Sequence, residues 1–233
     1  MFRKLLWKTE TALAPTLVRL HRRFIEPPAP NRRGERDIEY SWIAANIPEG
    51  NTEALDFASG PGWMGLLAAR KGFKVTALDI QSFSWYYVHP RLSFQQGDIL
   101  DCGFSPGQFD LILNISAIEH VGLVGRYGVS KERPDGDLEA MARFKTILKP
   151  GKLMLLTIPI GCDRVFSPLH RIYGPERLPR LLDGWKILSS EYWTKREMNQ
   201  WVQVEASIAL GKEPLAHSYG LGLFALTVSE NAR

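Results

Sequence analysis

The stretch EALDFASGPGWMGLLAARKG, residues 53–72, predicts a strand, a glycine-rich turn and a helix in that order. EALDF is a short apolar strand, and the helix after the turn ends at Gly72, a residue type that often terminates helices. The turn contains Gly60, Gly62 and Gly65 in a GxGxxG pattern. Such a pattern lets backbone N–H groups and a helix N-terminus approach a nucleotide with no Cβ in the way. The stretch therefore predicts a nucleotide site at the end of a strand.

The chain around this stretch continues to alternate strands with helices. DIEYSWIAANIP predicts a helix that begins near Asp37 and stops before Pro48, and GDLEAMARFKTILKPG predicts another. Six further strands are expected in FKVTALDI, LSFQQGDIL, FDLILNIS, KLMLLTIPI, WKILSSEYW and LGLFALTV. FKVTALDI is apolar almost throughout, as in a sheet buried on both faces. The pattern predicts an α/β fold with a doubly wound, mostly parallel, seven-stranded sheet.

Composition is that of a globular protein with a basic front end. The 233 residues are 45% hydrophobic and 23% charged, so one domain is expected over residues 37–233. No window holds the ~18 consecutive apolar residues that span a bilayer. The two cysteines, Cys102 and Cys162, have no metal-ligand spacing and form no disulfide framework. A reducing compartment, the cytoplasm, is the expected location.

Residues 1–36 are predicted to be a separate helical extension and linker. They hold nine Lys and Arg against three Asp and Glu, whereas the remaining chain holds 20 against 22. Apolar residues at helical spacing between these cations allow two interpretations. The segment is either a peripheral anchor on an anionic membrane surface or a pair of helices that covers the domain. The near-neutral body gives no argument for nucleic-acid binding.

The acid before the glycines separates two cofactor classes. A dinucleotide fold usually enters its glycine turn from an apolar strand, but here the strand carries Asp56, four residues before Gly60. The run from Asp56 to Gly62 resembles the D/E-x-G-x-G-x-G signature of class I S-adenosylmethionine-dependent methyltransferases, with Ala58 in place of the first glycine. The resemblance implies a Rossmann-like methyltransferase fold whose last strand pair is antiparallel, and S-adenosyl-L-methionine as the cofactor.

Three later segments resemble the same family in the same order. VTALDI carries Asp79, which is placed to accept hydrogen bonds from ribose hydroxyls, and QQGDIL carries Asp98 for the adenine amino group. FDLILNISAIEHVG resembles the fourth strand and its loop. The cofactor-binding residues that the resemblance implies are Asp56, Ala58, Gly60, Gly62, Asp79, Ile80, Asp98, Ile99 and Asn114.

His120, just past the fourth strand, is the predicted catalytic base. Methyl transfer to an oxygen needs a group that takes the hydroxyl proton, and an imidazole with a pKa near 6.5 suits that task at neutral pH. Glu119 is expected to orient His120 or to contact the cofactor. No metal constellation is expected. An alternative interpretation is that this Glu-His pair only shapes the loop.

Two insertions predict an acceptor site of polar side chains. VGLVGRYGVSKERPDGD follows His120, and IGCDRVFSPLHRIYGPERLPRLL follows the fifth strand, with His170, Arg171 and Tyr173 expected to contact a hydroxylated or acidic acceptor. Solvated surface loops are the alternative. EHVGLVGRYG, PDGDLEAM and LHRIYGPERLP resemble the uncharacterised domain-of-unknown-function 268 group, whose members are associated with sugar and polysaccharide biosynthesis. Val124 and VSKER depart from that group's pattern.

The resemblance favours O-methylation of a sugar or glycan hydroxyl. Three alternatives stay open: a phenol or quinone-precursor O-methyltransferase, a non-catalytic S-adenosylmethionine-binding subunit, and an oxidoreductase. Methylation of nucleic-acid bases is not expected, because NISA stands where such enzymes carry an NPPY-like tetrapeptide. The expected partner is therefore a small-molecule or glycan acceptor and not a nucleic acid.

Overall fold

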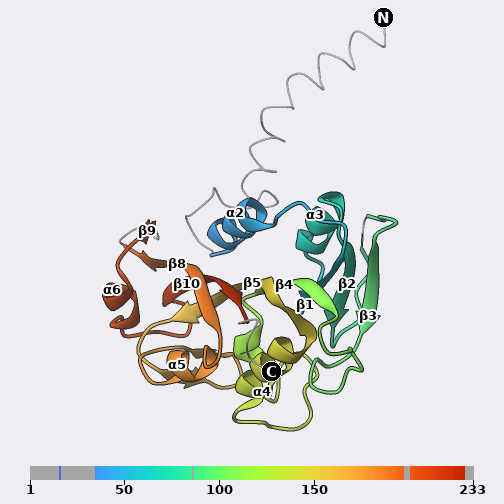
Figure 1. The fold of residues 1–233 in the computed structure, drawn as a ribbon. Helices are drawn as coiled ribbons and strands as arrows, with labels where there is room; N and C mark the ends of the chain where they lie inside the picture. Colours follow the sequence, from blue (N-terminus) through green and yellow to red (C-terminus); the bar gives the residue numbers. More distant parts are fainter. Residues whose placement is uncertain (1–15, 17–34, 86, 197–199, 229–233) are drawn as a thin grey trace, which may run out of the picture.

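Five parallel strands and three antiparallel ones form a single sheet in the computed structural model, which describes residues 16, 35–85, 87–196 and 200–228 (Figure 1). The strand order is β3-β2-β1-β4-β5-β10-β8-β9. The strands of this sheet are β1 (Glu53–Phe57), β2 (Lys74–Asp79), β3 (Leu92–Gln96), β4 (Phe109–Ile115), β5 (Leu148–Ile160), β8 (Lys186–Lys195), β9 (Trp201–Gln203) and β10 (Gly220–Thr227).

The order of the strands creates a switch point between β1 and β4. From β1 the chain proceeds outward to β2 and β3, and β4 then returns to the other side of β1. Loops that leave β1 and β4 therefore diverge at the carboxyl edge of the sheet, where open α/β sheets bind their ligands. β10 pairs with β5 and β8 in antiparallel fashion, so the expected antiparallel end of the sheet is confirmed.

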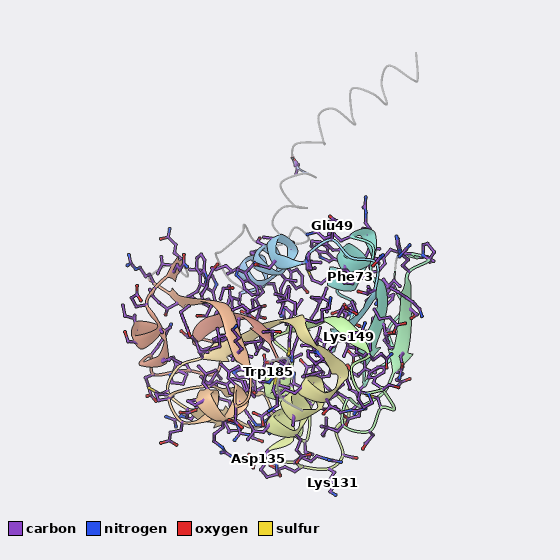
Figure 2. The ribbon with its side chains drawn as sticks, in the orientation of Figure 1. Glu49, Phe73, Lys131, Asp135, Lys149 and Trp185 are labelled. Carbon is purple, nitrogen blue, oxygen red and sulfur yellow. The ribbon has the colours of Figure 1, made fainter. Side chains whose placement is uncertain are left out.

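Helices cover both faces of the sheet. The α-helices are α2 (Arg36–Asn46), α3 (Met64–Arg70), α4 (Gly136–Ile147), α5 (Arg177–Leu181) and α6 (Ala206–Leu210), and η1 (Ile118–His120) is a short 3-10 turn. α2 and α3 lie on one side of the sheet and α4 and α5 on the other (Figure 1). Phe73 belongs to the core under α2 and α3, whereas Trp185 belongs to the core under α4 and α5 (Figure 2).

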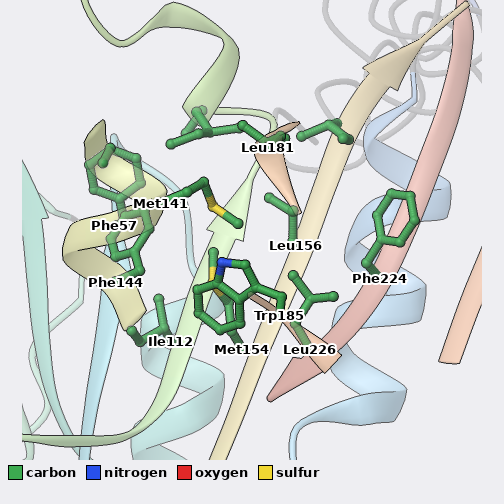
Figure 3. Close-up of a cluster of buried hydrophobic side chains, with 14 of the residues drawn as sticks. Phe57, Ile112, Met141, Phe144, Met154, Leu156, Leu181, Trp185, Phe224 and Leu226 are labelled. Carbon is green, nitrogen blue, oxygen red and sulfur yellow. The ribbon is translucent and has the colours of Figure 1, made fainter. Parts of the chain in front are cut away.

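The apolar strands of the sequence form the middle of the core. β4 is buried at every residue except its last, because helices cover both of its faces. On the α4 side, Ile112 of β4 and Met154 of β5 pack with Phe144 and Trp185 (Figure 3). Burial of each such side chain contributes about 1.5–3 kcal/mol to folding.

Gly72 ends α3 as the sequence predicts. Its φ of +104° lies in the left-handed region, and a Cβ at this position would be 2.0 Å from the carbonyl oxygen of Gly50. The chain can turn from α3 into β2 here only because no side chain is present.

The structure differs from the expected fold in three places. The sheet has eight strands instead of seven, because β9 pairs with the far end of β8. β5 begins at Leu148, earlier than the predicted strand KLMLLTIPI, so Pro150 and Gly151 lie inside the strand and not at the end of the helix before it. The second insertion is not an open loop: it contains the hairpin β6 (Arg164–Phe166) and β7 (His170–Ile172), followed by α5.

The predictions for the N-terminal extension fall on residues 1–34, of which all but residue 16 lie outside the described part of the chain. Glu35 and Arg36 are described, and Arg36 is the first residue of α2. Within the described ranges, no helix has the length and apolar character needed to cross a bilayer.

Candidate functional site

A cavity of about 600 Å³ lies at the carboxyl ends of β1, β2, β3 and β4, and is called here the cofactor cavity. Segments that directly follow these four strands make most of its wall. The sequence-predicted residues that line it are Asp56, Ala58, Gly60, Gly62, Asp79, Ile80, Asp98, Ile99 and His120. The fold thus brings nine of the eleven predicted site residues to one cavity, and leaves Asn114 and Glu119 outside its lining.

The glycine-rich turn carries two residues in the left-handed backbone region. Ala58 has a φ of +51° and Gly60 a φ of +50°. Glycine adopts this conformation readily, whereas a residue with a Cβ pays roughly 1–2 kcal/mol. The departure from the family signature at Ala58 therefore leaves the turn formed but strained, since Ala58 occupies a conformation that suits a glycine.

Asp56 fixes the start of α3 from within the core. Its side chain is buried, and its Oδ2 accepts the N–H of Gly65 at 2.9 Å. Burial raises the pKa of Asp56 to about 7, while the Gly65 N–H opposes that rise. A Cβ on Gly65 would lie only 2.7 Å from Asp56 Oδ2. The third glycine of the pattern is thus required by Asp56.

Asp79 joins the loops that follow β1 and β2. Its Oδ2 accepts the Gly60 N–H at 3.0 Å, and its Oδ1 accepts the Gln81 N–H at 2.9 Å. A carboxylate has about four lone-pair positions, so each oxygen retains one for a further donor in the cavity.

The loop after β3 supplies one acid and one apolar wall. Asp98 Oδ1 accepts the N–H of Leu100 at 2.9 Å, which holds the loop in a tight turn. Ile99 is 1% exposed and packs against the main core while it lines the cavity. The pair gives this end of the cavity a carboxylate beside an apolar surface.

Aromatic residues that the sequence reading missed brace the glycine turn. Trp85 Nε1 donates to the Gly60 carbonyl at 3.1 Å, and the Tyr87 hydroxyl donates to the Gly62 carbonyl. The two rings stack with centroids 5.5 Å apart. The aromatic run FSWYYV just after the second predicted strand was the available signal.

Asn114 lies beneath the site and is fully buried. Its Oδ1 accepts the N–H of Ile118 at 3.3 Å, which ties the end of β4 to the first residue of η1. The geometry here is that of a residue that shapes the turn carrying Glu119 and His120.

His120 is held by one ring nitrogen. Its Nδ1 lies 2.6 Å from the carbonyl oxygen of Leu169. Because a carbonyl only accepts, Nδ1 carries the hydrogen and Nε2 carries the lone pair. Burial lowers the pKa of His120 to about 3, and the positive charge of Arg126 adds to this effect against the opposing Leu169 hydrogen bond. The expected pKa near 6.5 is therefore corrected downward, and the ring is neutral at neutral pH.

Glu119 lies beside His120 but does not line the cofactor cavity. It is 3% exposed, and its Oε1 lies 3.7 Å from His120 Nε2. Its Oε2 is buried and has no hydrogen-bond partner among the described residues. Burial raises the pKa of Glu119 to about 8, with the nearby Glu39 carboxylate adding to the rise.

A second cavity of about 280 Å³, called here the polar cavity, lies on the other side of His120. Four residues line both cavities, namely Arg36, Ser116, His120 and Tyr127. The others that line the polar cavity are Glu35, Glu119, Arg126, Leu169, His170, His217 and Tyr219. His120 is thus shared between a space of nucleotide size and a smaller space with polar walls.

Arg171 builds the wall behind the polar cavity instead of lining it. It is 1% exposed and donates to the carbonyls of Glu119, Val121, Arg133 and Pro134 at 2.7–3.3 Å. The expectation that it contacts an acceptor is wrong. Its donors are consumed by the loop between η1 and α4, which it ties to β7.

Asp137 completes this buried network. The fully buried Tyr173 donates its hydroxyl to Asp137 Oδ2 at 3.0 Å, and Arg177 Nε donates to the same oxygen at 2.9 Å. Tyr173 was expected at the acceptor, and that expectation is also wrong. The segments PDGDLEAM and LHRIYGPERLP thus meet each other in space, and hold the Glu119–His120 turn in place.

Comparison with known proteins agrees with this geometry. Residues 54–151 match the family model described as a methyltransferase domain, and residues 103–215 match the one described as Caenorhabditis protein of unknown function, DUF268. The candidate methyltransferase YqeM of Bacillus subtilis (strain 168) is 32% identical over 78 residues, 31% of this chain and 31% of YqeM. The matched part is therefore about a third of that relative's length.

Solved structures show the same fold at low identity. The 1,6-didemethyltoxoflavin-N1-methyltransferase of Burkholderia thailandensis, solved with S-adenosylhomocysteine, is 17% identical with a TM-score of 0.53, covering 80% of this chain and 77% of that one. The cyclase SpnF is also 17% identical, with a TM-score of 0.57 and coverage of 82% and 80%. These likenesses establish the Rossmann-like methyltransferase fold.

The glycine turn, the acids at the strand ends and the two family matches converge on one assignment. Residues 54–151 carry a class I S-adenosylmethionine-dependent methyltransferase domain, whose cofactor is S-adenosyl-L-methionine, and residues 103–215 overlap it with a DUF268 match.

Proposed function

We propose that the protein transfers the methyl group of S-adenosylmethionine to a hydroxyl of a sugar or glycan. The observation that carries this proposal is the polar cavity that meets the cofactor cavity at His120. A phenolic acceptor would call for a largely apolar second site, whereas this one is lined by histidine, tyrosine, arginine and glutamate side chains.

In this proposal the cofactor lies along the carboxyl ends of β1 to β4. Asp79 would accept hydrogen bonds from the ribose hydroxyls with its remaining lone pairs, and Asp98 would accept one from the adenine amino group. Ile80 and Ile99 would flank the adenine ring, and the backbone of residues 58–62 would face the rest of the cofactor, since all of these residues line the cavity. Asn114 and Asp56 support the site through the backbone, since each accepts a hydrogen bond that fixes a turn beside the cavity.

The proposed chemistry is an in-line displacement at the methyl carbon. The acceptor oxygen forms a bond to that carbon as the carbon–sulfur bond breaks, and the electron pair of that bond stays on sulfur. The hydroxyl proton passes to His120 Nε2, the nitrogen that the Leu169 contact leaves with a lone pair. Positioning of the two reactants supplies much of the acceleration in such reactions, and a base adds about 10²–10⁴-fold.

The lowered pKa of His120 keeps Nε2 unprotonated at neutral pH, although it also makes the ring a weaker base. A neutral imidazole is present across the physiological range, so the base never requires deprotonation before it can act. The imidazolium that forms lies 3.7 Å from the Glu119 carboxyl, whose ionisation would stabilise it.

Labelled S-adenosylmethionine tests the proposal on a panel of nucleotide sugars, oligosaccharides and phenols. We expect label as a methyl ether on a sugar oxygen, with the phenols unlabelled. Label only on a phenol, or on nitrogen, would contradict the proposed acceptor. A glycan product would connect the protein with polysaccharide biosynthesis in the cytoplasm.

A further inference from the structure

Two buried side chains of the polar cavity have polar atoms that lack a hydrogen bond. Glu119 Oε2 and His170 Nε2 are both buried with no hydrogen-bond partner among the described residues. Glu119 is 3% exposed and His170 is 7% exposed. Buried polar atoms are nearly always satisfied in folded proteins, and each orphan costs about 1–3 kcal/mol. Two orphans at one cavity indicate that a ligand supplies the missing partners.

The side chains that carry these two atoms are both neighbours of the predicted base. Glu119 precedes His120 in η1, and the His170 ring lies with its centroid 6.2 Å from that of His120. A half-turn of the His170 ring exchanges Nε2 with Cε1 and breaks no hydrogen bond of Nε2, because that atom makes none. Glu119, His120 and His170 all line the polar cavity, so one small molecule bound there can contact all three side chains.

We propose that the polar cavity binds the acceptor through a second hydroxyl next to the reacting one, and that His170 and Glu119 hold this neighbouring hydroxyl. The inference rests on the proposed function and deepens it, since it restricts the acceptor to a vicinal diol. His120 takes the proton of one hydroxyl, and the other hydroxyl is oriented by the two orphan atoms.

The charge state of the pair suits a hydroxyl better than an anion. Burial lowers the pKa of His170, so its ring is neutral at pH 7, and the pKa of Glu119 near 8 keeps that carboxyl mostly protonated there. Neutral imidazole and neutral carboxyl each offer one donor and one acceptor, as a hydroxyl does.

The two arginines of the polar cavity point to the competing occupant. Arg36 is paired with the buried Glu39 at 2.8 Å. Arg126 lies 4.6 Å over the Tyr127 ring and forms no ion pair with a described residue. A phosphate or carboxylate held by Arg126 is therefore the alternative that the experiment has to separate.

The test uses the full chain with S-adenosylhomocysteine bound and two ring alcohols of matched shape. Binding of trans-1,2-cyclohexanediol and of cyclohexanol is followed through the NMR signals of the histidine imidazoles. We expect the diol to shift the His120 and His170 signals saturably, and to bind about fivefold more tightly than cyclohexanol. Inorganic phosphate is titrated in parallel.

Two variants make the test specific. His170→Phe keeps a planar ring against Phe166 and Tyr219 but has no nitrogen, and is expected to erase the preference for the diol. His89→Phe lies outside both cavities and should keep it. Because His170 Nε2 makes no hydrogen bond in the fold, we expect the His170 variant to remain folded.

Equal binding of the two alcohols, no diol binding up to its solubility, or an unchanged preference in His170→Phe would overturn the inference. Saturable phosphate binding without diol binding would show an anion site held by Arg126 instead. The proposed function fails separately: the diol would bind with the expected preference, yet no sugar hydroxyl would receive label.

Discussion

The cofactor cavity and the polar cavity are built in different ways. The cofactor cavity is made by short segments that each follow a strand, and its critical contacts join a carboxylate to a nearby backbone N–H, as between Asp56 and Gly65. The polar cavity gathers residues from positions 35–36, 116–127, 169–170 and 217–219. Its support is a buried arginine that reaches four carbonyls of a distant loop.

This difference suggests that the acceptor in the polar cavity can vary, whereas the cofactor-binding turns cannot. A strand-end turn that binds a cofactor is fixed by local backbone geometry, so small residues and acids recur at short spacing. An acceptor site shaped by long-range side-chain contacts can change its occupant while the sheet is unchanged. The following experiments test this division, in order of decreasing expected effect.

Replacing His120, which lines both cavities, should slow methyl transfer and leave cofactor binding intact. We expect His120→Ala and His120→Gln to lower turnover by about 10²–10⁴-fold, because neither side chain can accept the hydroxyl proton. Affinity for S-adenosylhomocysteine, measured by calorimetry, should stay within a few-fold of wild type. Near-normal turnover in both variants would make His120 a structural residue of η1.

Removing Arg171, the buried arginine behind the polar cavity, should destabilise the fold. Arg171→Ala takes a buried cation from beside Asp137 and removes one donor from each of four carbonyls, so we expect a loss of about 3–5 kcal/mol in the free energy of unfolding. Arg164→Ala is the control, because its pair with Glu213 is exposed and contributes about 0–1 kcal/mol. Urea melts that give equal losses would refute the supporting role of Arg171.

The buried acid should make stability depend on pH. Because folding raises the pKa of Glu119 from 4.5 to about 8, its contribution is fully present below pH 4.5 and is lost as pH rises through 8. Relative to wild type, Glu119→Gln should therefore gain stability progressively between pH 5 and pH 8, on the order of a few kcal/mol. Thermal melts across that range provide the measurement, and a constant difference would show that Glu119 ionises normally.

A Cβ should be harmful at Gly65 in the glycine turn and harmless at Gly103, a glycine in open space elsewhere in the chain. In Gly65→Ala the new Cβ would lie 2.7 Å from Asp56 Oδ2, so we expect a loss of about 1–3 kcal/mol and weaker cofactor binding. Gly103→Ala meets nothing within 4 Å and should change stability by less than about 0.5 kcal/mol. If the two alanines behave alike, the close approach at Asp56 is not what requires glycine.

The same division explains what the sequence could predict. The cofactor cavity could be predicted because Asp56, Gly60 and Asp79 lie at the ends of strands. The order of those strands follows from the alternation of strands and helices in the sequence. β9 was missed because three residues give no periodicity. Arg171 and Tyr173 were misplaced because a polar side chain in an insertion looks the same in sequence whether it faces a ligand or a buried Asp137.

For His120, the position could be predicted from the sequence but the pKa could not. Its position followed from the motif order, but its pKa depends on the burial and the Leu169 carbonyl contributed by a segment 49 residues away. No local pattern contains that contact. The polar cavity itself needed the three-dimensional fold, because His217 and Tyr219 join it from the last connection before β10.

Calorimetric titration of S-adenosylhomocysteine and NAD into wild type and Asp79→Ala tests the central assignment most directly. The account predicts one saturable site for S-adenosylhomocysteine, no heat from NAD, and an affinity about 10- to 150-fold lower in the variant, as expected for losing 1.5–3 kcal/mol of hydrogen bonds to a charged group. Binding of NAD without binding of S-adenosylhomocysteine, or unchanged affinity in Asp79→Ala, would contradict it.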